Sequence, residues 1–479
     1  MKARMFDTSV QELKYKVLKE VATLAYEDRL QEGILDIPET IVPGPHALMR
    51  CCIYKERAIV NERVKLAMGG DKSNPNVIEV LPIACDECPI TQIRVTDSCR
   101  GCIAHRCVNS CPKDAVQIVN HKAVIDHDKC ILCGRCMKEC PYNAIEKSLR
   151  PCENACKVNA IKMGPDRKAN IDNEKCIGCG ACVYQCPFGA VMDKSFILDA
   201  INILRGSENN EKYKVYAVVA PSISGQFGDS IGKVVSALKK LGFFSVVEAA
   251  LGADMVAYKE AQELKEKGFL TSSCCPAFVR YIETQFPDLA KHISHNLSPM
   301  AEIARYIKHT DPDCKIIFIG PCTAKKEEIR KDTVKDYIDN VITFEELLAL
   351  FDSRGIEVSE QEEDVLDNAS YYGRIFARSG GVTDAVRQAL KELGVTDEEF
   401  HFNPVACSGI ENCKVALLKA SKGILEQNFI EGMACNDGCI GGAACLTHGP
   451  KDRAAVDKYG REALEKTITD AISVYDLSK

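Results

Sequence analysis

The stretch CILCGRCMKECP, residues 130–141, decides how the first half of this chain folds. Its spacing is C-x2-C-x2-C-x3-C-P, and CIGCGACVYQCP from Cys176 repeats that spacing without deviation. A looser copy, CRGCIAHRCVNSCP, begins at Cys99. Thiolates at this spacing wrap a loop around one [4Fe–4S] cube, and the proline turns the chain so that the fourth cysteine faces a neighbouring cluster. A structural zinc site is the alternative, although zinc sites use two separated C-x2-C pairs.

The crossover of the fourth cysteine divides the cysteines between residues 85 and 186 into four sets. A fainter copy, CENACKVNAI from Cys152, keeps the C-x3-C ending but has Lys157 in place of the proline. The outlying pair Cys85 and Cys88 belongs to no copy and completes the last set. The predicted ligand sets are Cys99, Cys102, Cys107 and Cys140; Cys130, Cys133, Cys136 and Cys111; Cys176, Cys179, Cys182 and Cys156; and Cys85, Cys88, Cys152 and Cys186. Three to four [4Fe–4S] clusters are therefore expected in this region.

Length and composition narrow the class of protein. A chain of 479 residues is expected to form two or three domains. Its 27 cysteines, without an apolar export signal, favour metal coordination over a disulfide framework. The net charge of -7 and the lack of a polybasic run speak against nucleic acid and membranes as partners. We expect a soluble, cytoplasmic protein.

The texture of the sequence changes twice along the chain. Residues 1–84 are expected to be a helical segment without chemistry of its own, with a Pro/Gly loop at PETIVPGPHALM, residues 38–49. Residues 85–195 are the ferredoxin-like α+β cluster region. Residues 210–479 alternate apolar strand-like runs with amphipathic helices and predict an α/β domain. The polar stretch RGSENNEKYK, residues 205–214, is the expected hinge between the last two regions.

Three further cysteine motifs lie in the α/β region: TSSCCPAF (271–278), IGPCTAKKEE (319–328) and EGMACNDGCIGGAAC (431–445). Each stands where a strand or loop turns toward a helix, as expected for a site assembled from several loops at one sheet edge. In this order they resemble the three signature motifs of the [FeFe]-hydrogenases. The pieces APSISGQFG, LGADMVAYKEA and SGGVTDA also resemble that family, from about Tyr213 to beyond residue 445.

The resemblance implies an H-cluster, which is a [4Fe–4S] cube joined through one cysteine to a di-iron unit that carries CO, cyanide and a bridging dithiolate amine. The cube ligands carried over by motif position are Cys275, Cys322, Cys435 and Cys439, with Cys439 bridging to the di-iron unit. Lys325 and Ser298 match donors to the cyanide ligands, and Met433 matches a thioether that packs on the di-iron unit. Taken alone, these three residues also fit a surface lysine, a helix N-cap and a core methionine.

The resemblance gives the adjacent cysteine, Cys274, a different role. In the family the first cysteine of this pair is not a ligand but passes protons to and from the bridging amine. A thiol suits that task because its reference pKa of about 8.5 lets it give and accept a proton at modest cost. Glu260, Ser294 and Glu263 match the family's outward relay. Glu260 and Glu263 are also one helical turn apart, a spacing that usually marks a solvated face.

The chain departs from the common family pattern near the site. Gly320 replaces a methionine, Ala277 a glycine, Phe278 a tryptophan, and Asn436-Asp437 a Pro-Gly pair. These departures resemble the branch called group B. They bear on rate, catalytic bias and oxygen sensitivity, because groups around the ligands tune the redox potential.

The expected function is the reversible reaction of H2 to two protons and two electrons, in an anaerobic cytoplasm and with a soluble ferredoxin as partner. Two alternatives stay open. One is a hydrogen sensor with slow turnover. An appended signalling domain would favour that alternative, whereas after residue 445 the sequence predicts only a short helix, GREALEKTITDAI, residues 460–472. The other is a hydrogenase-like iron–sulfur assembly protein without a di-iron unit. Cysteines without an assigned role are Cys51, Cys52, Cys407, Cys413 and Cys445.

Overall fold

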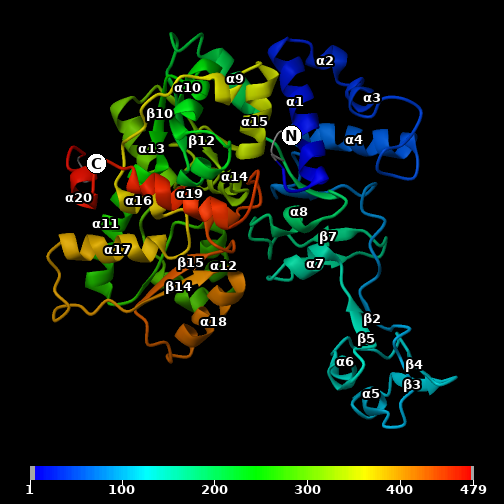
Figure 1. The fold of residues 1–479 in the computed structure, drawn as a ribbon. Helices are drawn as coiled ribbons and strands as arrows, with labels where there is room; N and C mark the ends of the chain where they lie inside the picture. Colours follow the sequence, from blue (N-terminus) through cyan, green and yellow to red (C-terminus); the bar gives the residue numbers. More distant parts are fainter. Residues whose placement is uncertain (1–5, 476–479) are drawn as a thin grey trace.

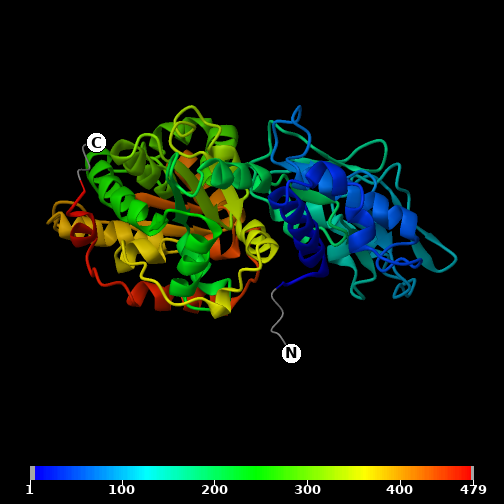
Figure 2. The same ribbon diagram turned by 90° about the horizontal axis from the view of Figure 1, so that it is seen from above.

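The computed structural model describes residues 6–475 as a large upper body and a smaller lower lobe (Figure 1). Seen from above, the N-terminal helices and the cysteine-rich region lie on one side of the large α/β domain (Figure 2). Among the helices of the described residues, none is both long and apolar enough to cross a membrane.

The N-terminal segment is helical and packs against the large domain. Its helices are α1 (Ser9–Tyr26), α2 (Leu30–Gly33), α3 (Ile37–Ile41) and α4 (Ile53–Ala67). Thr8 caps α1 by accepting a hydrogen bond from the backbone N–H of Gln11 at 3.2 Å. The apolar side chains of α1, among them Val17 and Val21, belong to the same core as the central sheet. The expected loop at residues 38–49 begins as the helix α3, because proline is well tolerated in a first helical turn.

The cysteine-rich region consists of short antiparallel strand pairs and one-turn helices. Its strands are β1 (Ile78–Val80), β2 (Gln92–Val95), β3 (Val116–Val119), β4 (Lys122–Ile125), β5 (Ile145–Ser148), β6 (Ile161–Met163), β7 (Ala169–Ile171) and β8 (Val191–Asp193). Its helices are α5 (Arg106–Asn109), α6 (Arg135–Glu139), α7 (Pro151–Ala155) and α8 (Ala181–Gln185). The pairs are β1–β8, β2–β5, β3–β4 and β6–β7.

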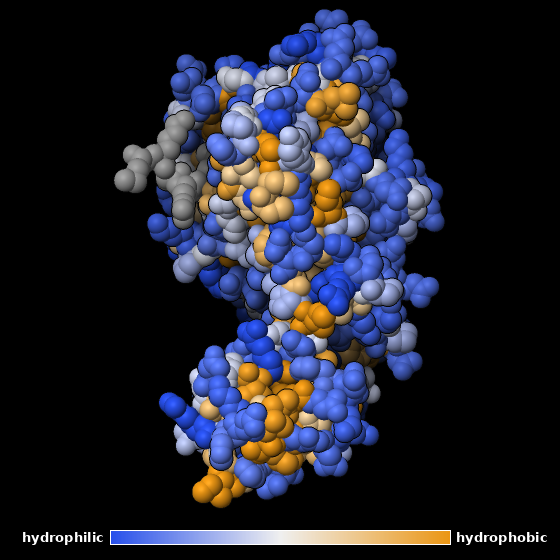
Figure 3. All heavy atoms as spheres, turned by 90° about the vertical axis from the view of Figure 1, so that its right-hand side faces the viewer, coloured by the Kyte–Doolittle hydropathy of each residue, from blue (hydrophilic) through white to orange (hydrophobic). Residues whose placement is uncertain are grey.

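The lower lobe of Figure 1 contains β2 to β5 with α5 and α6. It is joined to the body through the ladder of β2 and β5, in which Gln92 pairs with Ser148. Apolar side chains gather on the face of the lobe seen in Figure 3, and its exposed apolar residues include Ile103 and Ile131.

The large domain is built on two parallel sheets. One has the strand order β10-β9-β12-β13 and the other β11-β15-β14. Its strands are β9 (Val215–Val219), β10 (Ser245–Glu248), β11 (Leu270–Thr271), β12 (Lys315–Gly320), β13 (Asn340–Thr343), β14 (Pro404–Ser408) and β15 (Phe429–Met433). These strands read as apolar runs because helices cover both faces of a parallel sheet. The α/β fold class is confirmed.

The helices of the large domain follow the amphipathic patterns of the sequence, with one difference at the C-terminal end. They are α9 (Ile197–Gly206), α10 (Ile231–Leu241), α11 (Ala249–Lys267), α12 (Pro276–Gln285), α13 (Pro299–Thr310), α14 (Ala324–Glu328), α15 (Phe344–Ser353), α16 (Tyr371–Ile375), α17 (Gly381–Glu392), α18 (Ile410–Ser421), α19 (Pro450–Arg461) and α20 (Ile468–Ile472). The short helix expected over residues 460–472 is wrong: α19 ends there and α20 begins after a break, where Thr467 caps it.

The topology places the three cysteine motifs together. TSSCCPAF leaves the end of β11, IGPCTAKKEE the end of β12, and EGMACNDGC the end of β15. The carboxyl ends of parallel strands are where α/β folds build their sites.

Candidate active site and iron–sulfur sites

Four cysteines from three loops converge at the ends of β11, β12 and β15. Burial, together with the charges of Cys322 and Cys275, raises the pKa of the Cys439 thiol to about 12. Burial also raises the pKa of the Cys435 thiol, and the charges of Cys322, Cys275 and Cys439 add to that effect. The four cysteines of the H-cluster set, Cys275, Cys322, Cys435 and Cys439, are therefore within electrostatic reach of one another.

The loop that carries Cys435 and Cys439 is a tight turn that needs its glycines. Gly438 has φ +89°, a conformation that favours glycine, and its N–H donates to the oxygen of Cys435 at 3.3 Å. A Cβ on Gly441 would lie 2.0 Å from the oxygen of Asn436. The turn thus brings both cysteines to the same side, as the C-x3-C spacing suggests.

Lys325 and Met433 are buried within the motifs that carry Cys322 and Cys435, and Ser298, also buried, lines a cavity with Ser273 and Pro276, the residues that flank the cysteine pair. Lys325 donates to the backbone oxygen of Cys274 at 3.4 Å and pairs with Glu328 at 2.7 Å. Ser298 occupies the N-cap position of α13 without capping it, and within the described residues its buried hydroxyl has no hydrogen-bond partner. A buried hydroxyl without a partner is costly unless a further polar group is bound. Met433 ends β15 and is also buried. These residues fit a cofactor that carries polar ligands.

Cys274 is buried next to the quartet, within electrostatic reach of Cys275 and Cys439 and of the carboxylate of Glu260. Burial raises the pKa of its thiol well above the usual range, and the charge of Glu260 adds to the effect. Glu260 is fully buried; its Oε1 accepts from the N–H of Ser273 at 3.2 Å. Burial raises the pKa of Glu260 to about 7. Its Oε2 has no partner among the described residues.

The polar series continues from Glu260 to the surface. Ser294 lies close enough to affect the pKa of Glu260, and it donates to Glu263 Oε2 at 3.1 Å. Glu263 then accepts from Lys267 at 2.6 Å, beside the exposed His295. The solvated-face interpretation of the two glutamates does not apply, because Glu260 is 0% exposed and the Glu263 side chain 13% exposed.

The structure also brings together the cysteines of the four predicted cluster sets. In the lower lobe, burial raises the pKa of Cys107, and Cys102 and Cys140 add to it. The pKa of Cys136 is likewise raised by burial and by the charges of Cys130, Cys111 and Cys133. In the part nearer the large domain, burial raises the pKa of Cys182, and the charges of Cys179, Cys176 and Cys156 add to it.

The fourth set is assembled across the chain. Burial raises the pKa of Cys152 to about 12, and the charges of Cys186, Cys85 and Cys88 raise it as well. The N–H of Ala169 donates to the sulfur of Cys85 at 3.3 Å. Among residues 6–475, no three His, Cys, Asp or Glu side chains are close enough to hold a single metal ion.

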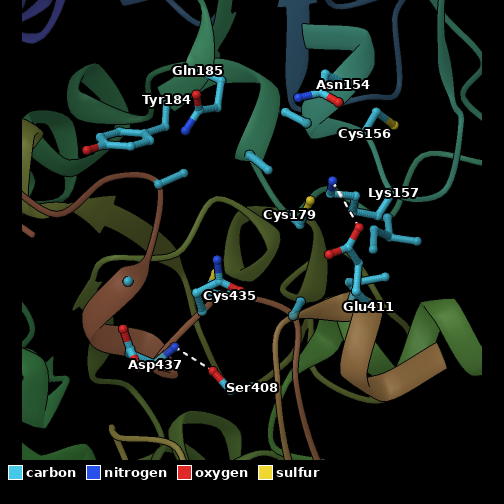
Figure 4. Close-up of a pocket in the computed structure, with 18 of the residues that line it drawn as sticks. Asn154, Cys156, Lys157, Cys179, Tyr184, Gln185, Ser408, Glu411, Cys435 and Asp437 are labelled. Carbon is cyan, nitrogen blue, oxygen red and sulfur yellow. Dashed lines mark hydrogen bonds and ion pairs between the residues drawn. The ribbon is translucent and has the colours of Figure 1, made fainter. Parts of the chain in front are cut away.

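A cavity of about 730 Å³ lies between the cysteine-rich region and the large domain. Cys156 and Cys179 line it from one side and Cys435 from the other (Figure 4). An ion pair of Lys157 and Glu411 at 3.1 Å bridges the two parts at this cavity. The third cluster set and the H-cluster quartet therefore face each other across the domain boundary.

The departures from the family pattern have local structural reasons. A Cβ on Gly320 would lie 2.6 Å from the ring of Phe318, so the methionine common in the family does not fit here without rearrangement. The ring of Phe278 occupies the space beside Gly432, where a Cβ would lie 2.1 Å from it. Phe278 and Gly432 thus form a matched pair next to Met433.

Six cysteines have no assigned role; Cys314 is buried just before β12, and the other five fall into three places. Cys51 and Cys52 are exposed at the start of α4. Cys407 and Cys413 are buried together, and Cys413 donates to the oxygen of Met433 at 3.6 Å. Cys445 is buried beside the loop of Cys439, to whose oxygen it donates at 3.7 Å.

Sequence reasoning missed two residues near the site, Thr323 and Lys326. Thr323 Oγ1 donates to the oxygen of Gly178 at 2.7 Å, and Lys326 is fully buried among carboxylates. Both stand near Cys322 in the second motif, but nothing in the local sequence pattern distinguishes them from threonine and lysine residues at a protein surface.

Three family models match parts of this chain. Residues 213–443 match the family described as iron only hydrogenase large subunit, C-terminal domain. Residues 123–146 match a 4Fe-4S binding domain, and residues 150–190 a 4Fe-4S dicluster domain.

Three relatives show the range of similar proteins. Iron hydrogenase 1 of Clostridium pasteurianum is 30% identical over 404 residues, covering 72% of this chain and 69% of that protein. The periplasmic [Fe] hydrogenase large subunit of Nitratidesulfovibrio vulgaris is 29% identical over 379 residues, covering 67% of this chain and 86% of that protein. Cytosolic iron-sulfur assembly component 3 of Bos taurus is 25% identical over 298 residues, covering 50% of this chain and 60% of that protein. This chain, with its 4Fe-4S domains, belongs to the iron-only hydrogenase family.

Proposed function

We propose that this chain is a hydrogenase that interconverts H2 with two protons and two electrons. The observation that carries the proposal is the place of Cys274, a buried thiol outside the cysteine quartet and at the inner end of the polar series through Glu260. A protein that only stores or passes electrons has no use for a proton route that starts beside its innermost cysteines.

The cofactor implied is the H-cluster. When bound, it would supply the metal site at which H2 is split into two protons and two electrons. Cys275, Cys322, Cys435 and Cys439 would hold its cube, with Cys439 bridging to the di-iron unit. Lys325 and Ser298 would donate hydrogen bonds to its cyanide ligands, because one is a buried ammonium and the other a buried hydroxyl that has no partner within residues 6–475. Met433 would pack against the di-iron unit.

The residues of the chain would move the protons. Cys274 holds a proton at Sγ, since burial favours the neutral thiol. Glu260, with its pKa raised to about 7, takes up and releases a proton near neutral pH. Ser294 and Glu263 extend the route to Lys267 at the surface.

The [4Fe–4S] clusters bound by the four predicted cysteine sets would carry electrons between the site and the surface. These are the sets that include Cys99, Cys130, Cys176 and Cys85. The lower lobe is the outer end of this series, and its Cys133 is exposed. A soluble one-electron carrier, such as ferredoxin in an anaerobic cytoplasm, is the partner we propose.

A second candidate function is iron–sulfur cluster assembly, which the similarity to the bovine assembly component favours. Such a protein would keep the cube ligands but would have no need of the groups that serve a di-iron unit. The retention of Cys274, Lys325, Ser298 and Met433 supports the hydrogenase instead.

Infrared spectra of anaerobically matured protein test the proposal. We expect stretching bands of metal-bound CO and cyanide. A matured protein with a full iron content and no such bands would refute the hydrogenase and leave the assembly function standing.

A further inference from the structure

Three residues that follow Cys322, namely Thr323, Lys325 and Lys326, contact different parts of the molecule. Thr323 is 1% exposed, and its Oγ1 donates to the oxygen of Gly178 at 2.7 Å. Gly178 precedes Cys179 in the loop CIGCGAC. Lys325 faces the quartet, and Lys326 turns away from it. The start of α14 is therefore a joint between the cysteine-rich region and the large domain.

The loop CIGCGAC approaches α14 at backbone distance. Gly178 and Gly180 have φ of +66° and +73°, which favours glycine at both positions. A Cβ on Gly180 would lie 2.7 Å from Thr323 Oγ1, and a Cβ on Gly178 would lie 2.7 Å from Glu327. The glycines serve this close approach, so the hydrogen bond of Thr323 belongs to a contact shaped on both sides.

The other side of α14 is anchored by buried charges. The ammonium of Lys326 donates to Asp193 Oδ2 at 3.0 Å, to the oxygen of Lys194 at 2.8 Å and to Glu346 Oε1 at 3.0 Å. All three donors of Lys326 are used. Asp193 ends β8, shortly after Cys186, so Lys326 holds α14 against the cluster region.

We propose that Thr323 is a positioning residue for electron transfer between the cluster of the Cys179 set and the cube of the Cys322 set. The carbonyl carbon of Gly178 is bonded to the nitrogen of Cys179, and the nitrogen of Thr323 is bonded to the carbonyl carbon of Cys322. The hydrogen bond between Thr323 Oγ1 and the oxygen of Gly178 thus completes a bonded route from one cysteine to the other. One electron crosses it, one cluster is oxidised, the other is reduced, and no bond or proton changes place.

The inference rests on the proposed function, because it takes both cysteines as cluster ligands. Three variants test it: Thr323→Val, which keeps the branched shape but removes the donor; Thr323→Ser, which keeps the donor; and Thr333→Val, a control at an exposed threonine. Two readouts need electrons to cross the joint: H2 oxidation with an artificial electron acceptor, and the magnetic interaction between the two reduced clusters in electron paramagnetic resonance. Exchange of isotopes between D2 and water needs the catalytic site but no electron leaving it.

We expect Thr323→Val to lower acceptor-coupled H2 oxidation several-fold and to weaken the magnetic interaction, while isotope exchange and iron content stay at the level of the Thr333→Val control. Thr323→Ser should restore both lowered readouts. Unchanged oxidation and magnetic interaction in Thr323→Val would overturn the inference, and so would equal losses of oxidation, exchange and iron, which indicate a merely structural role. A wild-type protein without isotope exchange would refute the proposed function, and the magnetic interaction would then decide the role of Thr323 by itself.

Discussion

Replacing Lys326 by methionine removes the central charge of a buried network without removing much volume. Lys326 is 0% exposed and bonds to Asp193 and Glu346, while Lys14 binds the other oxygen of Asp193 at 2.5 Å. Breaking a buried ion pair by removing one partner typically costs about 3–5 kcal/mol, because it leaves an uncompensated charge.

The remaining contacts place the expected loss at the lower end of that range. Asp193 keeps Lys14, and Glu346 keeps hydrogen bonds from Ser195 Oγ at 2.6 Å and from the N–H of Phe196 at 2.8 Å. We therefore expect Lys326→Met to lower the free energy of unfolding by about 3 kcal/mol. The matched control is Lys335→Met, where the exposed pair with Asp332 should contribute at most about 1 kcal/mol.

Urea unfolding at neutral pH, followed by circular dichroism and by iron–sulfur absorbance, measures the difference. The chain has no tryptophan, so indole fluorescence is not a probe. The double variant Lys326→Met/Asp193→Asn removes a positive and a negative charge and should lose less than the sum of the single changes. A loss of under about 1 kcal/mol in Lys326→Met would refute the view that the network holds α14 in place.

The same network predicts a pH dependence. Burial alone would raise the pKa of Asp193, but the ammonium groups of Lys14 and Lys326 outweigh it and hold the pKa below the usual range. The stabilisation is therefore present above the unfolded pKa of about 3.9 and is lost as the pH falls below it. Lys326→Met should show a shallower loss of stability on acidification than the wild type.

Further predictions concern the site and its clusters. Cys274→Ala should keep the infrared bands and abolish turnover. The control Cys314→Ala, at a buried cysteine before the start of β12, whose other end carries the motif, should keep both; turnover in Cys274→Ala would exclude the thiol from the proton route. Burial raises the pKa of Glu260 to about 7, so the wild type loses stability as the pH rises from about 4.5 through 7, and Glu260→Gln should remove up to about 3 kcal/mol of that loss; parallel stability profiles of the two proteins would contradict it. Cys85→Ser should lose about four iron atoms per chain and Cys51→Ser none; equal iron contents would remove Cys85 from the fourth set. Gly432→Ala should cost about 1–3 kcal/mol in unfolding free energy, because its Cβ would meet the ring of Phe278; a neutral effect would show that the ring moves freely.

Spacing predicted the sets built from the repeated motif, because each copy places three cysteines in one short loop and the fourth cysteine of each lower-lobe copy goes to the neighbouring set. The third set departs from this pattern only by the lysine in place of a proline. Spacing did not assign the fourth set, because Cys85 and Cys88 belong to no copy of the motif. The strands β9 and β12 could be predicted because the apolar runs VYAVVAPS, residues 215–222, and CKIIFIGP, residues 314–321, are long enough to recognise. The strand β11, which positions Cys274, could not be predicted in this way because it is only two residues long.

The contacts that join the regions could not be predicted in the same way. Lys326 and Asp193 are 133 residues apart, and Thr323 and Gly178 are 145 apart. Each reads locally as an ordinary polar residue, and its burial depends on how two separately patterned regions dock. The prediction of a loop over residues 38–49 was wrong at its start, where the helix α3 lies, because proline permits the first turn of a helix as readily as a loop.

The ladder of β2 and β5 has a consequence for the history of the chain. Because Gln92 and Ser148 are paired, the lobe leaves the body and returns to it at one point. Residues 92–148 are therefore an insertion in topological terms, and the cysteines before and after it, Cys85, Cys88 and Cys152, meet as if it were not there. A two-cluster unit of this kind can be gained, lost or exchanged as a cassette while the parent scaffold keeps its own clusters and its fold.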